Sequence, residues 1–486
     1  MKKKSIIILL VICSIIFITT GTFAYYRYSV NGSIIGKTGN YTFNVTSNST
    51  TTKDINLGSN LKPFDKGSFN LTVKLDNTDC DAYYTLKIEK TNLPKGFKFL
   101  AQNDNISPFS THSKYFDAGD NKTDTVTIYW YWDGNVDDEN DTSFIGKTIS
   151  ANIVINSKQA NPAYMKNGYS EDENANGGTE FWNNNYKPYI RTINFGNDLS
   201  NLPSSCTEEN LCWDITESGN NIVYGYLIDS GLKDSTDSTK SLYNLYIVSE
   251  NEIFASVDCG YIFSHFANLI SINFNNNFNT IKVKQMNYMF WLCSSLITLN
   301  LNEFYTSNVV KMNGMFTNCM NLEKLNIENF DTSNVYDMRD MFSILKNLKE
   351  LNLSNFNTSN VTDMWHMFTE STALIKLNLS NFDTTNVTSM ENMFSSCSSL
   401  VALDLSSFDT TNVTNMQCMF YECSNLQTTI NILNKNTTYT DIFAGNALTD
   451  TNANVTIGYT SETKAIAEAI KETAGSNKSK ITLKQI

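Results

Sequence analysis

The chain is poor in the side chains on which many catalytic and metal sites depend. Only three histidines occur among its 486 residues, His112, His265 and His366, and they lie in unrelated contexts. A zinc site or a nucleophilic triad needs a histidine close to further ligands or partners. The sequence therefore supports neither, and His366, at a variable position of a repeat, is expected to be a solvated surface residue.

Several motifs and one kind of charge pattern are missing as well. The sequence has no G-x-S-x-G turn, no Walker loop and no glycine-rich dinucleotide fingerprint. Lys and Arg number 36 against 49 Asp and Glu, and no basic stripe follows residue 4. Binding to nucleic-acid phosphates needs clustered Lys and Arg. We therefore expect a protein that is not an enzyme, has no cofactor and binds no nucleic acid.

One acidic loop is a candidate for an ion. Residues 133–141 bring together several carboxylate and amide oxygens, the ligands that Ca²⁺ prefers. The loop lacks the glycine that an EF-hand has at its sixth place, and a solvated hairpin loop is the alternative. No metal site is predicted.

Residues 1–24 have the composition of an export signal. Three lysines precede an apolar run at residues 6–18 and a small-residue junction, Thr22-Phe23-Ala24. The run is shorter than the roughly 20 residues that span a bilayer, so we expect cleavage and an extracellular protein. An uncleaved membrane anchor and a lipidated Cys13 are the alternatives. No sorting motif or apolar segment follows at the C-terminus, so no covalent wall anchor is expected.

Export permits disulfides, so the cysteines fall into two groups. Cys206 and Cys212 lie close in sequence around a turn, and they either form a small disulfide loop or stay free. Four others share one position of a repeat and are expected to be small buried core residues. These are Cys293, Cys319, Cys397 and Cys423.

The first part of the chain has the pattern of strands. Apolar and polar residues alternate at residues 68–75, 125–132 and 147–155. Several such strands in about 130 residues predict an antiparallel, Ig-like β-sandwich at residues 25–158, serving as a stalk or spacer. A polar stretch rich in Asn and Gly then predicts a linker at residues 159–180.

A 26-residue repeat dominates the second half. Phenylalanine recurs at this interval and follows a methionine each time, at Phe290, Phe316, Phe342, Phe368, Phe394 and Phe420. In one unit, Leu351 and Leu353 alternate as on a short strand. The turn Asn357-Thr358-Ser359-Asn360 is expected to bond to the backbone and to cap the next segment, residues 361–368, which has helical spacing.

Such a coil cannot bury its apolar side alone, so the coils are expected to stack. Residues 260–430 are predicted to form a leucine-rich-repeat solenoid, with a parallel sheet on one side and short helices or 3-10 turns opposite. A β-rich cap at residues 181–259 and an α/β cap at residues 431–486 would close its two ends. The predicted fold class is α+β.

The strand side of this solenoid carries a polar strip. Residues between the buried leucines point outward, and they place Asn300, Asn326, Asn352, Asn378 and Asp404 at equivalent positions, flanked by Lys324, Glu328, Glu350 and Lys376. Solenoids commonly bind on this side, so the strip is the candidate binding face. The alternative is that the stacked Asn side chains bond only to one another. The strip has no aromatic residue, which argues against stacking on a sugar.

The segment from Leu351 to Met364, followed by Met367-Phe368, resembles the BspA-like leucine-rich-repeat surface proteins, and the resemblance covers about residues 181–430. It implies adhesion to a surface protein of a host or of a partner cell. Leu345 and Ser371 depart from the repeat cysteine, and no ligand is identified.

The N-terminal segment is more weakly similar to camelysin-type and matrix-fibre proteins of Gram-positive bacteria. This likeness implies the cell surface of a bacterium of that type. It also gives an alternative function, in which the predicted sandwich associates with itself, by donating a strand to a neighbour, and builds a surface fibre or matrix.

Overall fold

The computed structural model describes residues 26–29, 38–45, 49–58, 61–75, 81–94, 96–102, 108–109, 111–134, 144, 149–166, 186–218 and 221–486. The predicted export signal and most of the acidic loop lie outside these residues. The described chain consists mainly of β-strands with few helices, consistent with the coarse fold class expected from the sequence. None of the helices in these ranges is long and apolar enough to cross a membrane.

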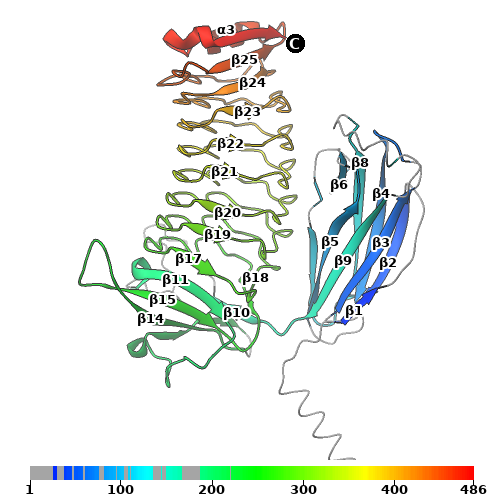
Figure 1. Cartoon of the computed structure of the whole chain (residues 1–486), viewed down its shortest axis with the longest axis vertical. Helices are drawn as coiled ribbons and strands as arrows, with labels where there is room; N and C mark the ends of the chain where they lie inside the picture. Colours follow the sequence, from blue (N-terminus) through cyan, green and yellow to red (C-terminus); the bar gives the residue numbers. More distant parts are fainter. Residues whose placement is uncertain are drawn as a thin grey trace, which may run out of the picture.

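Residues 26–159 form two sheets, which we call the two-sheet unit (Figure 1). One sheet has the order β1 (Tyr26–Ser29), β3 (Ser49–Gly58), β9 (Ile149–Gln159), β5 (Ala82–Asn92), β7 (Thr111–Phe116). The other has the order β2 (Thr38–Val45), β4 (Lys66–Leu75), β8 (Thr123–Trp132), β6 (Phe97–Leu100). Leu71 and Trp130 of one sheet share a buried core with Tyr84 and Ile153 of the other. Most pairs are antiparallel, as expected, but β1–β3 and β2–β4 are parallel.

The predicted linker is partly structured. Only residues 160–162 separate β9 from the next strand, β10 (Ala163–Met165). That strand pairs with β13 (Thr216–Ser218) and β16 (Ile253–Phe254), and β16 pairs in turn with β18 (Phe278–Asn279). The chain therefore passes from the two-sheet unit into the next unit almost at once, and residues 167–180 of the predicted linker lie outside the described ranges.

We call the strands between the two-sheet unit and the repeated coils, from β10 to β18, the N-terminal cap. Its second sheet, the cap sheet, has the order β12 (Cys212–Asp214), β14 (Tyr224–Lys233), β15 (Ser241–Val248), β11 (Ile190–Gly196), β17 (Ser271–Asn273). The central strand β11 is parallel to both β15 and β17. Two 3-10 turns, η1 (Lys187–Tyr189) and η2 (Glu208–Asn210), precede β11 and β12. Cys206 and Cys212 form a disulfide, which decides between the two alternatives left by the sequence.

Residues 257–459 form a column of stacked coils, which we call the coil stack (Figure 1). One side carries parallel strands: β19 (Thr298–Asn300), β20 (Lys324–Asn326), β21 (Glu350–Leu351), β22 (Lys376–Leu377), β23 (Ala402–Asp404), β24 (Gln427–Ile432) and β25 (Asn454–Tyr459). Strands β21 to β25 continue into β26 (Ile481–Gln485), so one parallel sheet runs to the end of the chain. Helix α3 (Lys464–Glu472) and η3 (Gly475–Lys480) precede that last strand.

The side opposite the strands differs from the prediction. Residues 260–430 contain no helix; each coil makes turns there and joins the next coil by a parallel bridge and by further backbone hydrogen bonds, such as that from the Phe290 N–H to the Met315 carbonyl oxygen at 2.9 Å. Two residues per coil have left-handed backbones, as at Asp340 (φ 57°) and Ile344 (φ 58°), or His366 (φ 57°) and Glu370 (φ 56°). A left-handed residue cannot continue a right-handed helix. The expectation of short helices is therefore wrong. Each coil instead makes single turns with i→i−3 backbone bonds, as from the Thr369 N–H to the His366 carbonyl oxygen at 3.1 Å, and the residues at the predicted apolar spacing are buried.

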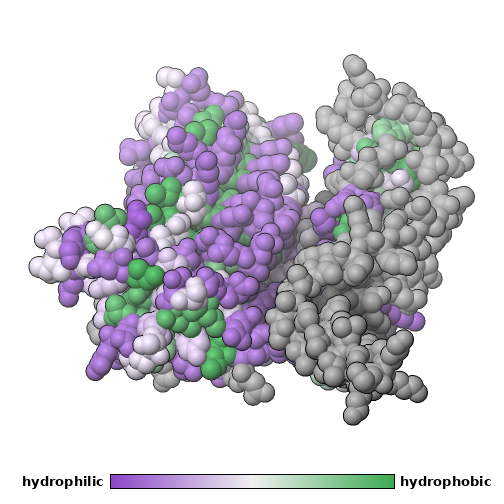
Figure 2. All heavy atoms as spheres, turned by 60° about the horizontal axis from the view of Figure 1, so that its bottom comes forward, coloured by the Kyte–Doolittle hydropathy of each residue, from purple (hydrophilic) through white to green (hydrophobic). Residues whose placement is uncertain are grey.

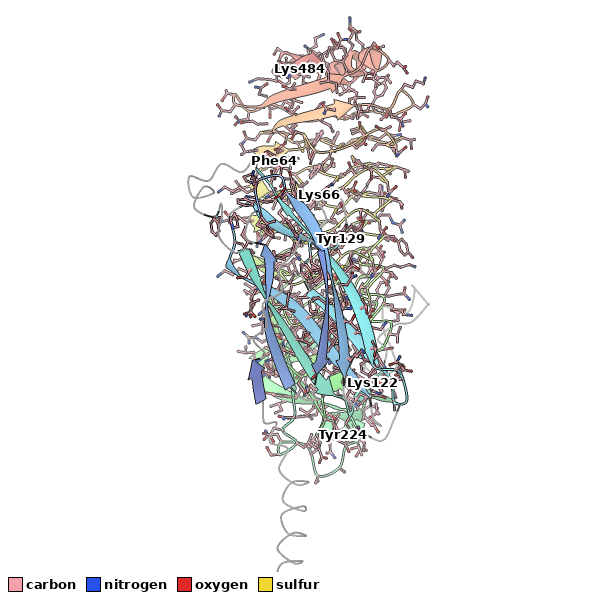
Figure 3. All side chains as sticks on the ribbon, turned by 90° about the vertical axis from the view of Figure 1, so that its right-hand side faces the viewer. Phe64, Lys66, Lys122, Tyr129, Tyr224 and Lys484 are labelled. Carbon is pink, nitrogen blue, oxygen red and sulfur yellow. A yellow bond between two sulfur atoms is a disulfide. The ribbon has the colours of Figure 1, made fainter. Side chains whose placement is uncertain are left out.

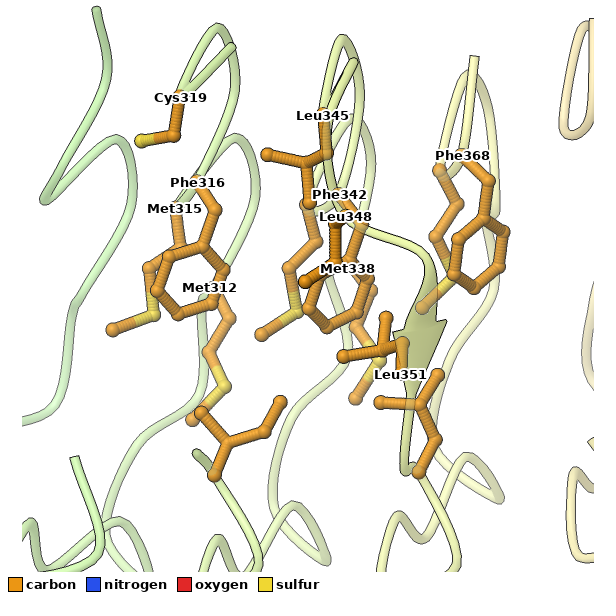
Figure 4. Packing of buried hydrophobic residues seen from close by; sticks show 14 of the residues in the cluster. Met312, Met315, Phe316, Cys319, Met338, Phe342, Leu345, Leu348, Leu351 and Phe368 are labelled. Carbon is orange, nitrogen blue, oxygen red and sulfur yellow. The ribbon is translucent and has the colours of Figure 1, made fainter. Parts of the chain in front are cut away.

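The predicted phenylalanine and methionine columns are confirmed as core (Figure 4). The rings of successive coils lie nearly parallel, with centroids 5.4–5.8 Å apart from Phe290 to Phe420. The column continues in both directions, to Phe263 and to Phe443. Aromatic stacking thus joins each coil to the next along the whole coil stack.

The repeat cysteines are buried and free, as expected. The Cys397 thiol donates a hydrogen bond to the carbonyl oxygen of Phe368 in the preceding coil, with Sγ 3.1 Å away, and burial raises its pKa to about 12. Ser371 replaces cysteine at this position and keeps the bond, with its Oγ 2.8 Å from the Phe342 carbonyl oxygen. The departure from the repeat therefore preserves the interaction between coils.

The two-sheet unit stands beside the coil stack (Figure 1) and covers part of it when seen from that side (Figure 3), and side chains of the two are in contact. Lys282 of the coils has its ammonium 3.0 Å from an Asp117 carboxylate oxygen and 3.9 Å from the centre of the Tyr115 ring. Farther along, the hydroxyls of Ser113 and Ser307 are 2.6 Å apart. These contacts reach the turns that come after the strands, and they leave the strand side open.

Candidate functional site

Parallel pairing places the predicted strip residues in register on neighbouring strands. Asn300 lies opposite Asn326 on β19 and β20, and Glu350 lies opposite Lys376 on β21 and β22. The short strands form because a leucine on each one points into the core while its neighbours point outward. Equivalent positions of successive coils therefore form columns on the strand side, as the repeat predicts.

These outward positions are open to solvent. Asn300, Lys324, Glu328, Glu350, Asn352, Lys376, Asn378 and Asp404 are exposed, and Asn326 is half-buried. Leu299, Leu351 and Leu403, which alternate with them, are buried. Figure 2 shows that hydrophilic residues predominate on the face of the cap and coils turned toward the viewer. The strand side thus presents polar side chains to solvent above a layer of buried leucines.

The asparagines at the strand ends support their own turns. The Oδ1 atom of Asn352 accepts a hydrogen bond from the backbone N–H of Ser354 at 3.2 Å. Asn300, Asn378 and Asp404 accept the same bond from the residue two positions on, at 3.2, 3.1 and 2.9 Å. The bonds from Ser406 also hold the pKa of Asp404 below its usual value. These bonds stay within one coil, so they favour a turn-forming role over the ladder of stacked amides.

The charged members of the strip are placed differently. Lys324, Glu350 and Lys376 alternate in sign along successive strands. None of the ion pairs found among the described residues involves these three side chains. An exposed charge that forms no ion pair within the fold stays available to a partner. Of the predicted residues, these three are the best candidates for direct contact.

A second polar group lies on the opposite side of the coil stack, and the sequence-based prediction missed it. Arg339 forms a bidentate pair with Asp337, at 3.0 and 2.8 Å. In the next coil, His366 packs on Trp365 with ring centroids 4.0 Å apart, and its Nδ1 lies 3.8 Å from an Asp340 carboxylate oxygen. The expectation that His366 is a solvated surface residue holds only in part, because its side chain is 29% exposed and burial lowers its pKa. The recurrence of an aspartate at one position of the repeat, Asp337 and Asp363, is the sequence feature that could have indicated this polar group.

This group makes the stability of the coil stack depend on pH. Burial raises the pKa of Asp340 to about 6 from an ordinary value of 3.8. The folded chain therefore binds this proton more tightly than the unfolded chain, and the resulting stability is lost as pH rises from about 4 to about 6. Asp340→Asn should consequently raise the free energy of unfolding at pH 7.5 and leave it unchanged at pH 4, measured by urea denaturation at both values.

Asparagine suits the backbone at this place, since Asn392 occupies the equivalent position with the same left-handed φ. Asp441→Asn is the matched control, because Asp441 shares the position and is exposed. An Asp340→Asn chain that is less stable than the parent at pH 7.5 would contradict the assignment.

No group of three or more His, Cys, Asp and Glu side chains within the described ranges is arranged to hold a metal ion. Most of the acidic loop, a candidate calcium site by its sequence, lies outside those ranges, at residues 135–143. The strand side carries exposed amides and charged side chains, which can form hydrogen bonds and salt bridges.

A family model matches the coil stack. It is described as a Mycoplasma protein of unknown function, DUF285, and it matches residues 257–351 and again residues 344–455. The similarity therefore covers the repeats and less than half of the chain. No curated protein and no solved structure matches the chain.

Proposed function

We propose that the coil stack is a leucine-rich-repeat solenoid of the BspA-like kind, that the two-sheet unit is a β-sandwich, and that the chain acts outside the cell as an adhesion protein. Its partner would be a protein on the surface of a host cell or a neighbouring cell. The observation that carries this proposal is the exposed row of alternating charges at Lys324, Glu350 and Lys376, which form no ion pair within the described fold.

Three features of the structure support binding on the strand side. The base under the strip is rigid, since stacked phenylalanine rings and bonds between coils fix each strand against the next. The two-sheet unit contacts the turn edge and leaves the strands uncovered. Alternating charge also suits a protein partner, because complementary charges fix the register of an interface and speed its formation.

Charge reversal on this strip tests the proposal. A full-length chain carrying Lys324→Glu, Glu350→Lys and Lys376→Glu should bind at least tenfold more weakly to cultured epithelial cells or to neighbouring bacteria, with its melting temperature unchanged. Fluorescence-detected binding, before and after trypsin treatment of the cells, measures the effect and establishes that the partner is a protein.

A matched control reverses three exposed charges outside the parallel sheet, with Lys435→Glu, Lys464→Glu and Glu468→Lys. This variant should bind as the parent does. The assigned face would be ruled out if the strip variant and the control bound equally well, or if binding survived trypsin treatment of the cells.

One observation in the two-sheet unit supports the alternative function, assembly into a surface fibre or matrix. Strand β1 pairs with only the first four of the ten residues of β3, from Ser49 to Thr52. Among the described residues no strand pairs with the remainder of that edge, where a strand from another copy could add, as assembly into a fibre requires. Light scattering of the full chain over a hundredfold range of concentration tests this function, which predicts growing assemblies and is contradicted by a constant monomer mass.

A further inference from the structure

We propose that the chain has a second binding site, separate from the strand strip, that takes a short neutral saccharide. The site is a groove of about 890 Å³ where the N-terminal cap meets the end of the two-sheet unit. A volume of this size lies within the range of small-molecule sites, roughly 300–1,000 Å³. The proposal goes beyond adhesion through the strip and shares no residue with it.

The topology of the cap sheet brings the walls of this groove together. Strands β11, β15 and β17 are parallel, so their carboxyl ends meet at one edge of the sheet. The loops that come after them, at residues 197–201, 250–252 and 275–277, all line the groove. The end of β9 and the short connection to β10 close it with Lys158, Ala160 and Asn161. Residues far apart in sequence thus form one concave surface.

Amide side chains dominate the lining. Eight of its residues are asparagines: Asn161, Asn194, Asn197, Asn201, Asn251, Asn275, Asn276 and Asn277. An amide both donates and accepts hydrogen bonds, as a sugar hydroxyl does. A ligand with many hydroxyls can therefore satisfy these side chains and be satisfied by them.

Some of these amides are held in place and others are open. The Nδ2 atoms of Asn275 and Asn277 donate to the carbonyl oxygens of Phe195 and Gly196, at 2.6 and 2.7 Å, which fixes both amide groups. By contrast, Asn197, Asn201 and Asn276 are exposed, and their side chains make no hydrogen bond among those described. The groove thus combines a preorganised wall with free polar groups, which lowers the entropic cost of binding.

Two aromatic rings form part of the lining. Tyr226 is buried and stacks on Tyr246 with centroids 5.2 Å apart, so it supports the half-buried Tyr246, whose ring is the one open to a ligand. Aromatic side chains offer an apolar face with a polar tip, a combination suited to the C–H faces and hydroxyls of a sugar ring. The strand strip has no such rings, which separates the two surfaces in chemistry as well as in place.

The charges of the lining favour a neutral ligand. Asp198, Glu250 and Glu252 contribute three carboxylates, and the single ammonium, that of Lys158, lies 2.7 Å from Glu252. The excess of negative charge opposes phosphates and acidic sugars. The groove also lies beyond the strand ends and presents side chains, whereas an added peptide strand needs an open strand edge. A neutral saccharide fits this lining better than a nucleotide or a peptide.

The test is calorimetric titration of the full chain with lactose, maltotriose, triacetylchitotriose, 3′-sialyllactose and tetraglycine. At least one of the three neutral sugars should bind, and 3′-sialyllactose should bind no more tightly than lactose. The paired substitution Asn197→Ala and Asn201→Ala should weaken that binding at least tenfold without changing the melting temperature. Asn436→Ala, an exposed asparagine distant in sequence from the groove, should leave the affinity unchanged.

The proposal is overturned if none of the neutral sugars binds, if 3′-sialyllactose or tetraglycine binds more tightly than all of them, or if the paired variant binds like the parent. The charge-reversed strip variant should keep its saccharide affinity. Failure of the adhesion proposal and failure of this one would therefore be seen in different variants.

Discussion

Replacing Phe342 by alanine should lower the free energy of unfolding of the coil stack by about 3–5 kcal/mol. The ring is fully buried and stacks on Phe316 and Phe368, with centroids 5.8 and 5.6 Å away. It also touches Phe356, which has its centroid at 6.1 Å. Bonds between coils hold the backbone on both sides, so the surrounding structure cannot collapse into the space left behind.

Urea denaturation of the full chain, followed by circular dichroism, measures this loss. Tyr336→Ala is the matched control, because Tyr336 belongs to the preceding turn and is 44% exposed; its effect should stay within about 0.5 kcal/mol. A Phe342→Ala chain as stable as the control would show that the phenylalanine column does not hold the coils together.

The Thr358→Val substitution should cost about 1–3 kcal/mol, although valine has nearly the same shape. The Thr358 hydroxyl is fully buried and donates to the carbonyl oxygen of Asp383 in the next coil at 2.8 Å. It also accepts the Asp383 backbone N–H at 2.8 Å. Valine removes both bonds and leaves the Asp383 carbonyl and N–H without these partners in a site shielded from water, which is the main source of the cost.

Thr362→Val provides the comparison, since Thr362 lies four residues later and is exposed. Thermal unfolding of both chains measures the difference, and we expect a lower melting temperature for Thr358→Val only. Equal melting temperatures would mean that the threonine column contributes nothing to the joining of coils.

The interior of the coil stack could be predicted well from the sequence. A strict 26-residue interval identified the Phe column and the buried cysteines, because each position of a repeat meets the same surroundings in every coil. The coil from Phe263 could also be recognised from the sequence, as one residue longer than the others, and its ring stacks on Phe290. The interval did not reveal Phe443, which comes 23 residues after Phe420 and stacks on it.

The direction of polar bonds could not be predicted from the repeat. The turn from Asn357 to Asn360 is predicted to bond to its own backbone, and Asn357 does accept the Ser359 N–H. Thr358, however, bonds to the next coil, and Asn360 donates to the Ser333 carbonyl oxygen of the previous one. The repeat fixes the position of a side chain within its coil, and this position is the same whether the side chain bonds to its own coil or to a neighbouring one. The prediction of short helices was wrong for a related reason, because Asp340 and His366 adopt left-handed backbone conformations, which the spacing of apolar residues does not reveal.

The exposure of the strip residues could be predicted from the sequence, but their hydrogen bonds could not. Exposure of Lys324, Glu350 and Lys376 results from strand alternation, which the repeat makes visible. The turn-forming role of Asn352 and its equivalents depends on backbone geometry, and the saccharide groove depends on residues from Lys158 to Asn277 that meet only in the folded chain. Contacts between residues far apart in the chain leave no local pattern in a sequence.

Photo-crosslinking from the two sides of the coil stack tests binding through the strand side most directly. Benzoylphenylalanine would replace Ala402, which is exposed on β23 in register with Lys376, or Thr362, which is exposed and adjoins the bridge on the opposite side. We predict that irradiation on cells that bind the chain links a cell-surface protein to position 402 and none to position 362. Linkage from position 362 alone, or equal linkage from both, would contradict binding through the strand side.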